Sequence, residues 1–396
     1  MNNDLQSQSI LNSKRTFTSF CTLGLAGVFI FSILPLLIGT MASELSLTPV
    51  QSGTIISVYY AGYSLITITS FIWFNRVIWK KSVIMGYFLA LFSITLLIFM
   101  NDYHGVLVSM VLLGFSGALL FSISMGIVAK TEKVDQNYAF KMVVEQLIPS
   151  IFVVIIPLFI IDKYGMSGLL ISVMVTYAIL LLFTNWVPDN KIENVKIDFK
   201  SICKSKSALI ALLGLLISFA GFLGLWGFVE IIAREYNISS DDSSVLLALS
   251  LLTSAVAPFM SGLISERFGR LMPIMFSLVV AILSFSLLFI EPSIYSFGAF
   301  VLLLIASYFF ALPYMFACIA KADNTGQLAV LSSAAVAVGS MLGAYFFGVF
   351  MEFSGITSAY IFSFVTIVLG MLLILKVEKT HDIKYLCKIE GKRINV

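Results

Sequence analysis

Charged residues are scarce in this chain, and that scarcity indicates the class of protein. Asp, Glu, Lys and Arg make up 11% of the 396 residues and hydrophobic residues 59%, and the mean hydropathy is +1.02. A water-soluble globule of this length cannot bury so much apolar side chain in its interior. The sequence therefore predicts a protein embedded in a membrane.

Histidine is nearly absent, and motifs for metals and nucleotides are missing. The two histidines, His104 and His381, are far apart, and no cluster of acids and histidines suits metal or acid-base catalysis. The chain also lacks the loop G-x-x-x-x-G-K-(S/T) that cradles nucleotide phosphates. We therefore predict no enzymatic activity, no cofactor, no bound metal and no direct use of ATP.

Long apolar runs recur along the chain at the length needed to cross a bilayer, which is about 20 residues for a helix. The runs are continuous rather than alternating, and lipid offers no partner to backbone groups, so we expect helices and not barrel strands. The twelve predicted spans are residues 16–40, 48–74, 80–100, 105–129, 139–161, 165–187, 207–233, 244–265, 271–290, 294–320, 325–351 and 355–376.

Basic residues fall almost entirely on one side of these spans. With a cytoplasmic N-terminus, only Lys163 and Arg234 of the 24 Lys and Arg residues lie outside, which leaves 22 inside. Loops rich in Lys and Arg remain in the cytoplasm. We therefore expect both termini to be cytoplasmic. The net charge of +3 is then a topology signal and not a sign of nucleic-acid binding.

A short charged segment in the second half, residues 261–270, has a degraded copy in the first half. An offset of 191 residues places Arg267 on Arg76, and both copies end an apolar run. The segment Ser-Gly-Leu-Ile-Ser-Glu-Arg-Phe-Gly-Arg resembles the loop signature of the major facilitator superfamily, G-x-L-a-D-R-x-G-R-(K/R). The matching positions, with Glu in place of Asp, are Gly262, Ile264, Glu266, Arg267, Gly269 and Arg270.

This resemblance implies an all-α membrane protein of twelve transmembrane helices in two pseudo-symmetric six-helix bundles. It also implies a secondary transporter that moves a small organic solute across the bacterial inner membrane by alternating access, with the solute bound at mid-membrane. We expect a monomer in the lipid bilayer that takes the solute and protons as partners. The expected parts are a leader at 1–15, a bundle at 16–188, a cytoplasmic linker at 189–206, a second bundle at 207–376 and a cytoplasmic tail at 377–396.

Two features of particular branches of that superfamily are missing. Met110 stands four residues before Gly114, where many proton-coupled members carry an arginine. Leu147-Ile-Pro-Ser150 replaces the drug-antiporter pattern G-x-x-x-G-P-x-x-G-G. Proton coupling is the leading hypothesis. The alternatives are an uncoupled facilitator, a multidrug or metabolite exporter and a non-transporting membrane sensor.

Acidic and polar residues inside two predicted spans are candidates for the substrate or proton pathway. Ionisable side chains are costly within a membrane and usually face a cavity. Lys141 and Arg234 each stand four residues from one of the acids, so local structural ion pairs are the alternative. The candidates are Glu145, Gln146, Trp226 and Glu230.

Aromatic residues in two further spans are candidates for the same pathway. Aromatic walls suit an organic solute, although they also serve simply as packing between helices. Pro35 in the first span removes a helical hydrogen bond, which frees a carbonyl and bends the helix. The aromatic candidates are Tyr59, Tyr63, Tyr308 and Tyr314.

The two charged loops predict a cytoplasmic gate. Arginines there can meet carboxylates and helix C-termini of the opposite bundle when the inner side closes. Because Asn75 replaces the acid in the first copy, the inward-closed state is predicted to depend on Glu266. The gate candidates are Arg76, Gly262, Glu266, Arg267, Gly269 and Arg270.

Overall fold

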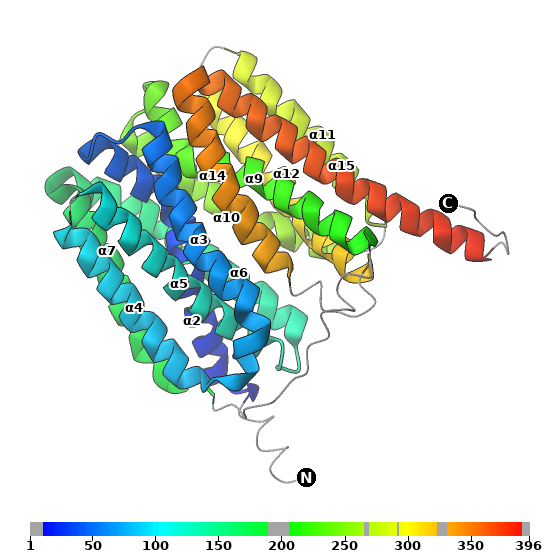
Figure 1. The fold of residues 1–396 in the computed structure, drawn as a ribbon, viewed down its shortest axis with the longest axis horizontal. Helices are drawn as coiled ribbons and strands as arrows, with labels where there is room; N and C mark the ends of the chain where they lie inside the picture. Colours follow the sequence, from blue (N-terminus) through cyan, green and yellow to red (C-terminus); the bar gives the residue numbers. More distant parts are fainter. Residues whose placement is uncertain are drawn as a thin grey trace, which may run out of the picture.

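The protein folds into two groups of long helices that lie side by side, one from each half of the chain (Figure 1). The structure is a computed structural model that describes residues 11–100, 102–188, 206–264, 269–290, 293–322 and 331–389, and these ranges contain no strand. The first group consists of α2 (Lys14–Glu44), α3 (Pro49–Trp73), α4 (Trp79–Phe99), α5 (Tyr103–Val128), α6 (Val134–Ile156) and α7 (Asp162–Leu181).

The second group repeats this arrangement with six more helices. Short 3-10 turns follow α3, α7 and α11, and a π turn at Pro157–Ile161 follows α6. The six helices are α9 (Lys206–Glu235), α10 (Ser240–Ile264), α11 (Leu271–Ser286), α12 (Ile294–Ala322), α14 (Ser332–Ser354) and α15 (Ile356–Ile389).

Ten segments of the described chain are long and apolar enough to cross a membrane. One of them, Gln136–Trp186, contains both α6 and α7 with the π turn between them, and α7 is kinked at Gly165, where φ is 57°. The remaining helix, α3, which contains three tyrosines, is not among the ten. All twelve predicted spans therefore correspond to helices.

The helix boundaries confirm the internal repeat that the charged loops predict. Adding 191 to the bounds of α3, residues 49–73, gives 240–264, which are the bounds of α10. Adding 191 to the bounds of α2, residues 14–44, gives 205–235, and α9 spans residues 206–235. The two halves are thus pseudo-symmetric six-helix bundles.

Three helix pairs join the bundles: α3 packs on α14, α6 on α10, and α2 on α9. The repeat relates α3 to α10 and α6 to α14, so the first two pairs are copies of each other. The third pair consists of α2 and α9, which the repeat relates to each other. Helix pairs exchanged in this way are what a two-fold pseudo-symmetry between bundles requires.

The α3–α14 seam is closest at the end of the bundles opposite the chain termini, the predicted outer end. A Cβ atom added to Gly53 would overlap the carbonyl oxygen of Ala344, so the two backbones are in contact. The Val50 N–H donates to Oε2 of Glu352 at 2.8 Å, and the Ser57 hydroxyl donates to the Met341 carbonyl. The outer halves of the bundles are therefore joined.

One predicted segment boundary differs from the structure, and two predicted segments cannot be compared with it. The last helix, α15, continues to Ile389 rather than ending near 376, so the start of the predicted tail is helical. The linker at 189–205 and the centre of the second charged loop, residues 265–268, lie outside the described residues.

Candidate functional site

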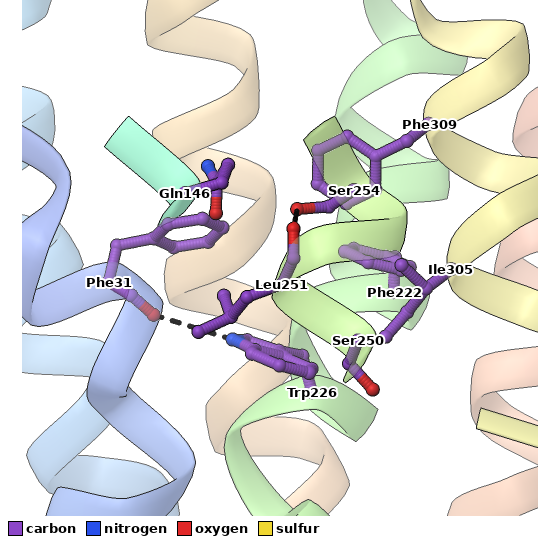
Figure 2. A pocket seen from close by; sticks show the side chains of 9 residues that line it. All are labelled: Phe31, Gln146, Phe222, Trp226, Ser250, Leu251, Ser254, Ile305 and Phe309. Atoms are coloured by element: carbon purple, nitrogen blue, oxygen red, sulfur yellow. Dashed lines mark hydrogen bonds between the residues drawn. The ribbon is translucent and has the colours of Figure 1, made fainter. Parts of the chain in front are cut away.

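A cavity lies between the two bundles, near the middle of the helices that line it (Figure 2). Helices α2, α6, α9, α10 and α12 surround this space. No lining residue is ionisable. The lining residues are Phe31, Gln146, Phe222, Trp226, Ser250, Leu251, Ser254, Ile305 and Phe309.

Two polar side chains of the lining have an unused hydrogen-bonding atom. Gln146 is 8% exposed, and its Oε1 has no partner. The Ser250 hydroxyl is also buried and without a partner, whereas the Ser254 hydroxyl donates to the Leu251 carbonyl at 2.7 Å. Buried polar atoms in folded proteins nearly always have partners. The Gln146 and Ser250 side chains are therefore candidates for contact with a bound solute.

Prolines in four of the lining helices remove backbone donors at the level of the cavity. An α-helical carbonyl normally accepts from the N–H four residues later, which proline lacks. The prolines within α2, α6, α10 and α12 are Pro35, Pro149, Pro258 and Pro313. The carbonyls that lose their usual donor are those of Phe31, Glu145, Ser254 and Phe309. Three of these residues line the cavity, and the fourth precedes a lining residue.

One of these carbonyls is used to join the bundles. The indole N–H of Trp226 in α9 donates to the Phe31 carbonyl of α2 at 3.4 Å (Figure 2). Beside it, the Phe222 ring stacks on Tyr308 with centroids 4.3 Å apart and planes 5° from parallel. The aromatic wall on the second bundle is thus held by stacking and by a hydrogen bond that crosses the interface.

A buried ion pair occupies the interior of the first bundle. The Lys141 ammonium binds the Glu145 carboxylate, and their side chains are only 1% and 6% exposed. The ammonium also lies 4.5 Å from the centre of the Phe121 ring. A Cβ atom added to Gly24 of α2 would lie 2.5 Å from Cε of Lys141, so the absence of a side chain there makes room for the pair. The predicted local ion pair exists, but it is buried.

A second ion pair lies at the predicted outer ends of α9 and α2. The Glu230 side chain is 1% exposed and accepts from Arg234 Nε at 3.3 Å. It also accepts from the Ser243 hydroxyl at 2.6 Å. Arg234 in turn donates through Nη1 to the Gly39 carbonyl of α2 at 3.1 Å. Glu230 therefore orients an arginine that links the bundles.

The four tyrosine candidates lie outside the cavity lining. A Cβ atom added to Gly117 of α5 would meet the Tyr59 hydroxyl at 3.3 Å and the Tyr63 ring at 3.6 Å, so both rings pack within the first bundle. Tyr308 stacks behind Phe222, as described above, and its hydroxyl pairs with Ser218 at 3.0 Å. The hydroxyl of the fourth, Tyr314, donates to the Ser261 carbonyl at 2.9 Å.

The predicted cytoplasmic gate is described only in part. Arg76 is exposed, and a Cβ atom added to Gly262 would meet nothing within 4 Å. Gly269 has a φ of 66°, a left-handed conformation that glycine adopts readily. Arg270 donates to the Ala317 carbonyl of its own bundle at 3.5 Å. Glu266 and Arg267 lie outside the described residues.

Two of the nine cavity residues, Gln146 and Trp226, were predicted from the sequence as pathway residues, and seven were not. A usable signal was nevertheless present, because residues four positions before a proline lose a helical donor. Applied to the four interior prolines, that rule selects three of the missed residues and also Glu145, the neighbour of Gln146. The missed residues are Phe31, Phe222, Ser250, Leu251, Ser254, Ile305 and Phe309.

Comparisons with known proteins agree with this architecture. Residues 210–386 match the family model described as the Major Facilitator Superfamily, and no curated protein matches the sequence. A D-xylose-proton symporter has a TM-score of 0.73 at 14% identity, with 91% of this chain and 97% of that chain covered. The nucleoside transporter NupG, as a D323A mutant, has a TM-score of 0.70 at 14% identity, with 93% and 99% covered.

A third solved structure, the human organic anion transporter MFSD10 (TETRAN), has a TM-score of 0.64 at 13% identity and covers 93% of this chain and 98% of that chain. At these identities the solved structures establish the fold. The family match covers the second bundle, and the helix repeat relates the first bundle to it. The second bundle therefore matches the Major Facilitator Superfamily, and the chain as a whole has the multi-pass membrane fold of these solved transporters.

Proposed function

We propose that this protein is a proton-coupled secondary transporter that carries a small organic solute across the bacterial inner membrane by alternating access. The observation that supports this most is the position of the cavity, which lies between the two bundles halfway along five helices. A solute there contacts both bundles at once, so it can favour one arrangement of the bundles over another. We propose that the protein acts as a monomer with both termini in the cytoplasm.

The two candidate acids, Glu145 and Glu230, have different surroundings, which suggests different roles. Glu145 is one residue from the cavity residue Gln146 and pairs with Lys141 inside the first bundle. We assign it the exchangeable proton, because a proton on this carboxylate breaks a buried ion pair, and Gly24 passes the change to α2. We assign Glu230 to the outer closure, since it orients the arginine that reaches across to α2.

The alternating arrangement is supported by where the bundles meet. Besides the Trp226–Phe31 bond at the level of the cavity, hydrogen bonds between the bundles join Val50 to Glu352, Ser57 to Met341 and Arg234 to Gly39, all on the predicted outer side of the cavity. We take these contacts as support for a state that is closed toward the outside.

Proton coupling can be tested in proteoliposomes that contain a pH-sensitive dye. A panel of nucleosides, pentoses, amino acids, carboxylates and drugs is screened for counterflow, and any transported solute is then tested for accumulation driven by a proton gradient. We expect Glu145→Gln to retain counterflow and lose accumulation. The control is Glu132→Gln, which removes an exposed glutamate near the same helix. Accumulation by Glu145→Gln would show that the proton site is elsewhere.

An uncoupled facilitator is the second candidate, and one observation favours it. Both candidate acids already have a basic partner, Lys141 for Glu145 and Arg234 for Glu230. Ion pairs of this kind can be structural only. Counterflow by the unmodified protein without any accumulation under a proton gradient would support this candidate over the first.

A further inference from the structure

We infer that the cavity selects an uncharged, ring-containing solute that offers N–H or O–H hydrogen-bond donors. This inference rests on the proposed transport function and adds the class of substrate. It is drawn from three properties of the cavity: its excess of acceptors, its aromatic walls and its lack of ionisable side chains.

Hydrogen-bond acceptors dominate around the cavity. Oε1 of Gln146 is buried and has no partner, and Figure 2 shows this side chain across the cavity from the second bundle. The prolines of α6, α10 and α12 add the carbonyls of Glu145, Ser254 and Phe309, which have lost their usual helical donor. Acceptors without donors are costly to bury. A solute that carries donors relieves this cost, whereas a carboxylate or phosphate can bond only to the few donors of the lining, the Ser250 hydroxyl and the Gln146 amide nitrogen.

Aromatic rings form the walls. Phe31 comes from the first bundle, and Phe222, Trp226 and Phe309 come from the second. Rings stack favourably on such side chains, while a linear polyol gains little from them.

Because the lining carries no charge, it favours an uncharged solute. None of its nine residues can ionise. The nearest buried carboxylate along the chain, Glu145, is already neutralised by Lys141. An ion moved from water into such a cavity loses its hydration without gaining a counter-charge. An uncharged solute avoids that loss.

Three probes of nearly equal shape test the inference: benzamide is neutral, benzoate is an anion and benzamidine is a cation. Binding of each to the purified full-length protein is measured by calorimetry and by the shift in unfolding temperature. We expect benzamide to bind and to raise the unfolding temperature, and the two ions to bind at least tenfold more weakly. Equal or tighter binding of benzoate or benzamidine overturns the inference, as does the absence of benzamide binding up to its solubility limit.

The acceptor is tested by Gln146→Leu, which keeps most of the side-chain volume and removes the oxygen. We expect benzamide to bind about tenfold more weakly, the size of one hydrogen bond. Gln136→Leu is the matched control on the same helix, since Gln136 is exposed, and it should bind normally. Equal effects of the two substitutions would contradict a role for Gln146. Failure of the transport proposal is a separate result, because it requires the proteoliposome panel to show no counterflow.

Discussion

Trp226 donates its indole N–H to the carbonyl of Phe31 in α2. That carbonyl has no helical donor, because the residue four positions later is Pro35. The proline and the tryptophan are therefore complementary: one releases an acceptor on the first bundle, and the other supplies a donor from the second. Under the offset of 191 residues, Trp226 is also the repeat counterpart of Pro35. The bundles thus meet at equivalent positions of their first helices.

Replacing Trp226 by Phe tests this contact. The substitution keeps an aromatic ring but removes the donor, so we expect a loss of about 1 kcal/mol in the stability of the joined bundles. The measurement is the unfolding temperature in a fixed detergent. Trp186→Phe is the control, because Trp186 lies at a helix end and is 37% exposed. If both substitutions lower the unfolding temperature equally, the contact with Phe31 contributes nothing.

The buried ion pair predicts a strong difference between single and double substitutions. Glu145→Gln leaves the Lys141 charge buried without its partner and should destabilise the protein by about 3–5 kcal/mol. Replacing both residues, Lys141→Met with Glu145→Leu, should restore most of the stability, since apolar pairs of similar volume replace buried ion pairs well. The measurement is again thermal unfolding. A double variant less stable than the single one would show that these groups have other essential partners.

Gly39→Ala should open the outer side. The added Cβ atom would overlap Cγ of Glu230, and such overpacking typically costs about 1–3 kcal/mol. We expect faster labelling from outside of a cysteine placed at Ser57, which is buried in the α3–α14 seam, in a background without the native cysteines. Gly298→Ala is the control, because its Cβ atom would meet Leu246 at an ordinary 3.6 Å. Equal labelling of the two variants would argue against Glu230 as part of the outer closure.

Neutralising Glu266 should shift the population toward the inward-open state, as its place in the charged loop predicts. The expected change is no more than about fivefold, because exposed ion pairs contribute about 0.2–1 kcal/mol. A cysteine placed at Ser261, which is buried near the cytoplasmic end of α10, reports the shift through faster labelling from the inside. Glu132→Gln serves as the control. Unchanged labelling in Glu266→Gln would remove this residue from the gate.

The helices and their repeat could be predicted because both depend on local properties of the chain. Apolar runs of spanning length are set by the thickness of the bilayer, and a single offset found in the charged loops relates α3 to α10 residue for residue. The end of α15 could not be predicted in this way. Charged residues become frequent after 376, and loss of hydropathy marks the edge of a membrane and not the end of a helix.

The cavity was less predictable, because its lining depends on how each helix is rotated. Gln146 and Trp226 were selected for polarity and position, and both face the cavity. Tyr308 was selected on similar grounds, yet Phe222 lies between it and the space. In a chain with 35 Phe residues, composition cannot tell which rings face the centre. The positions of interior prolines would have been a better guide.

The four interior prolines have a mechanical consequence. Each marks a point at which a lining helix bends easily, because a hydrogen bond is missing there, and all four points lie around the same space. A guest molecule that bonds to the exposed oxygens would stiffen those joints, and its departure would leave them pliable again. The protein would then be stiffer with solute bound and more flexible without it in each transport cycle.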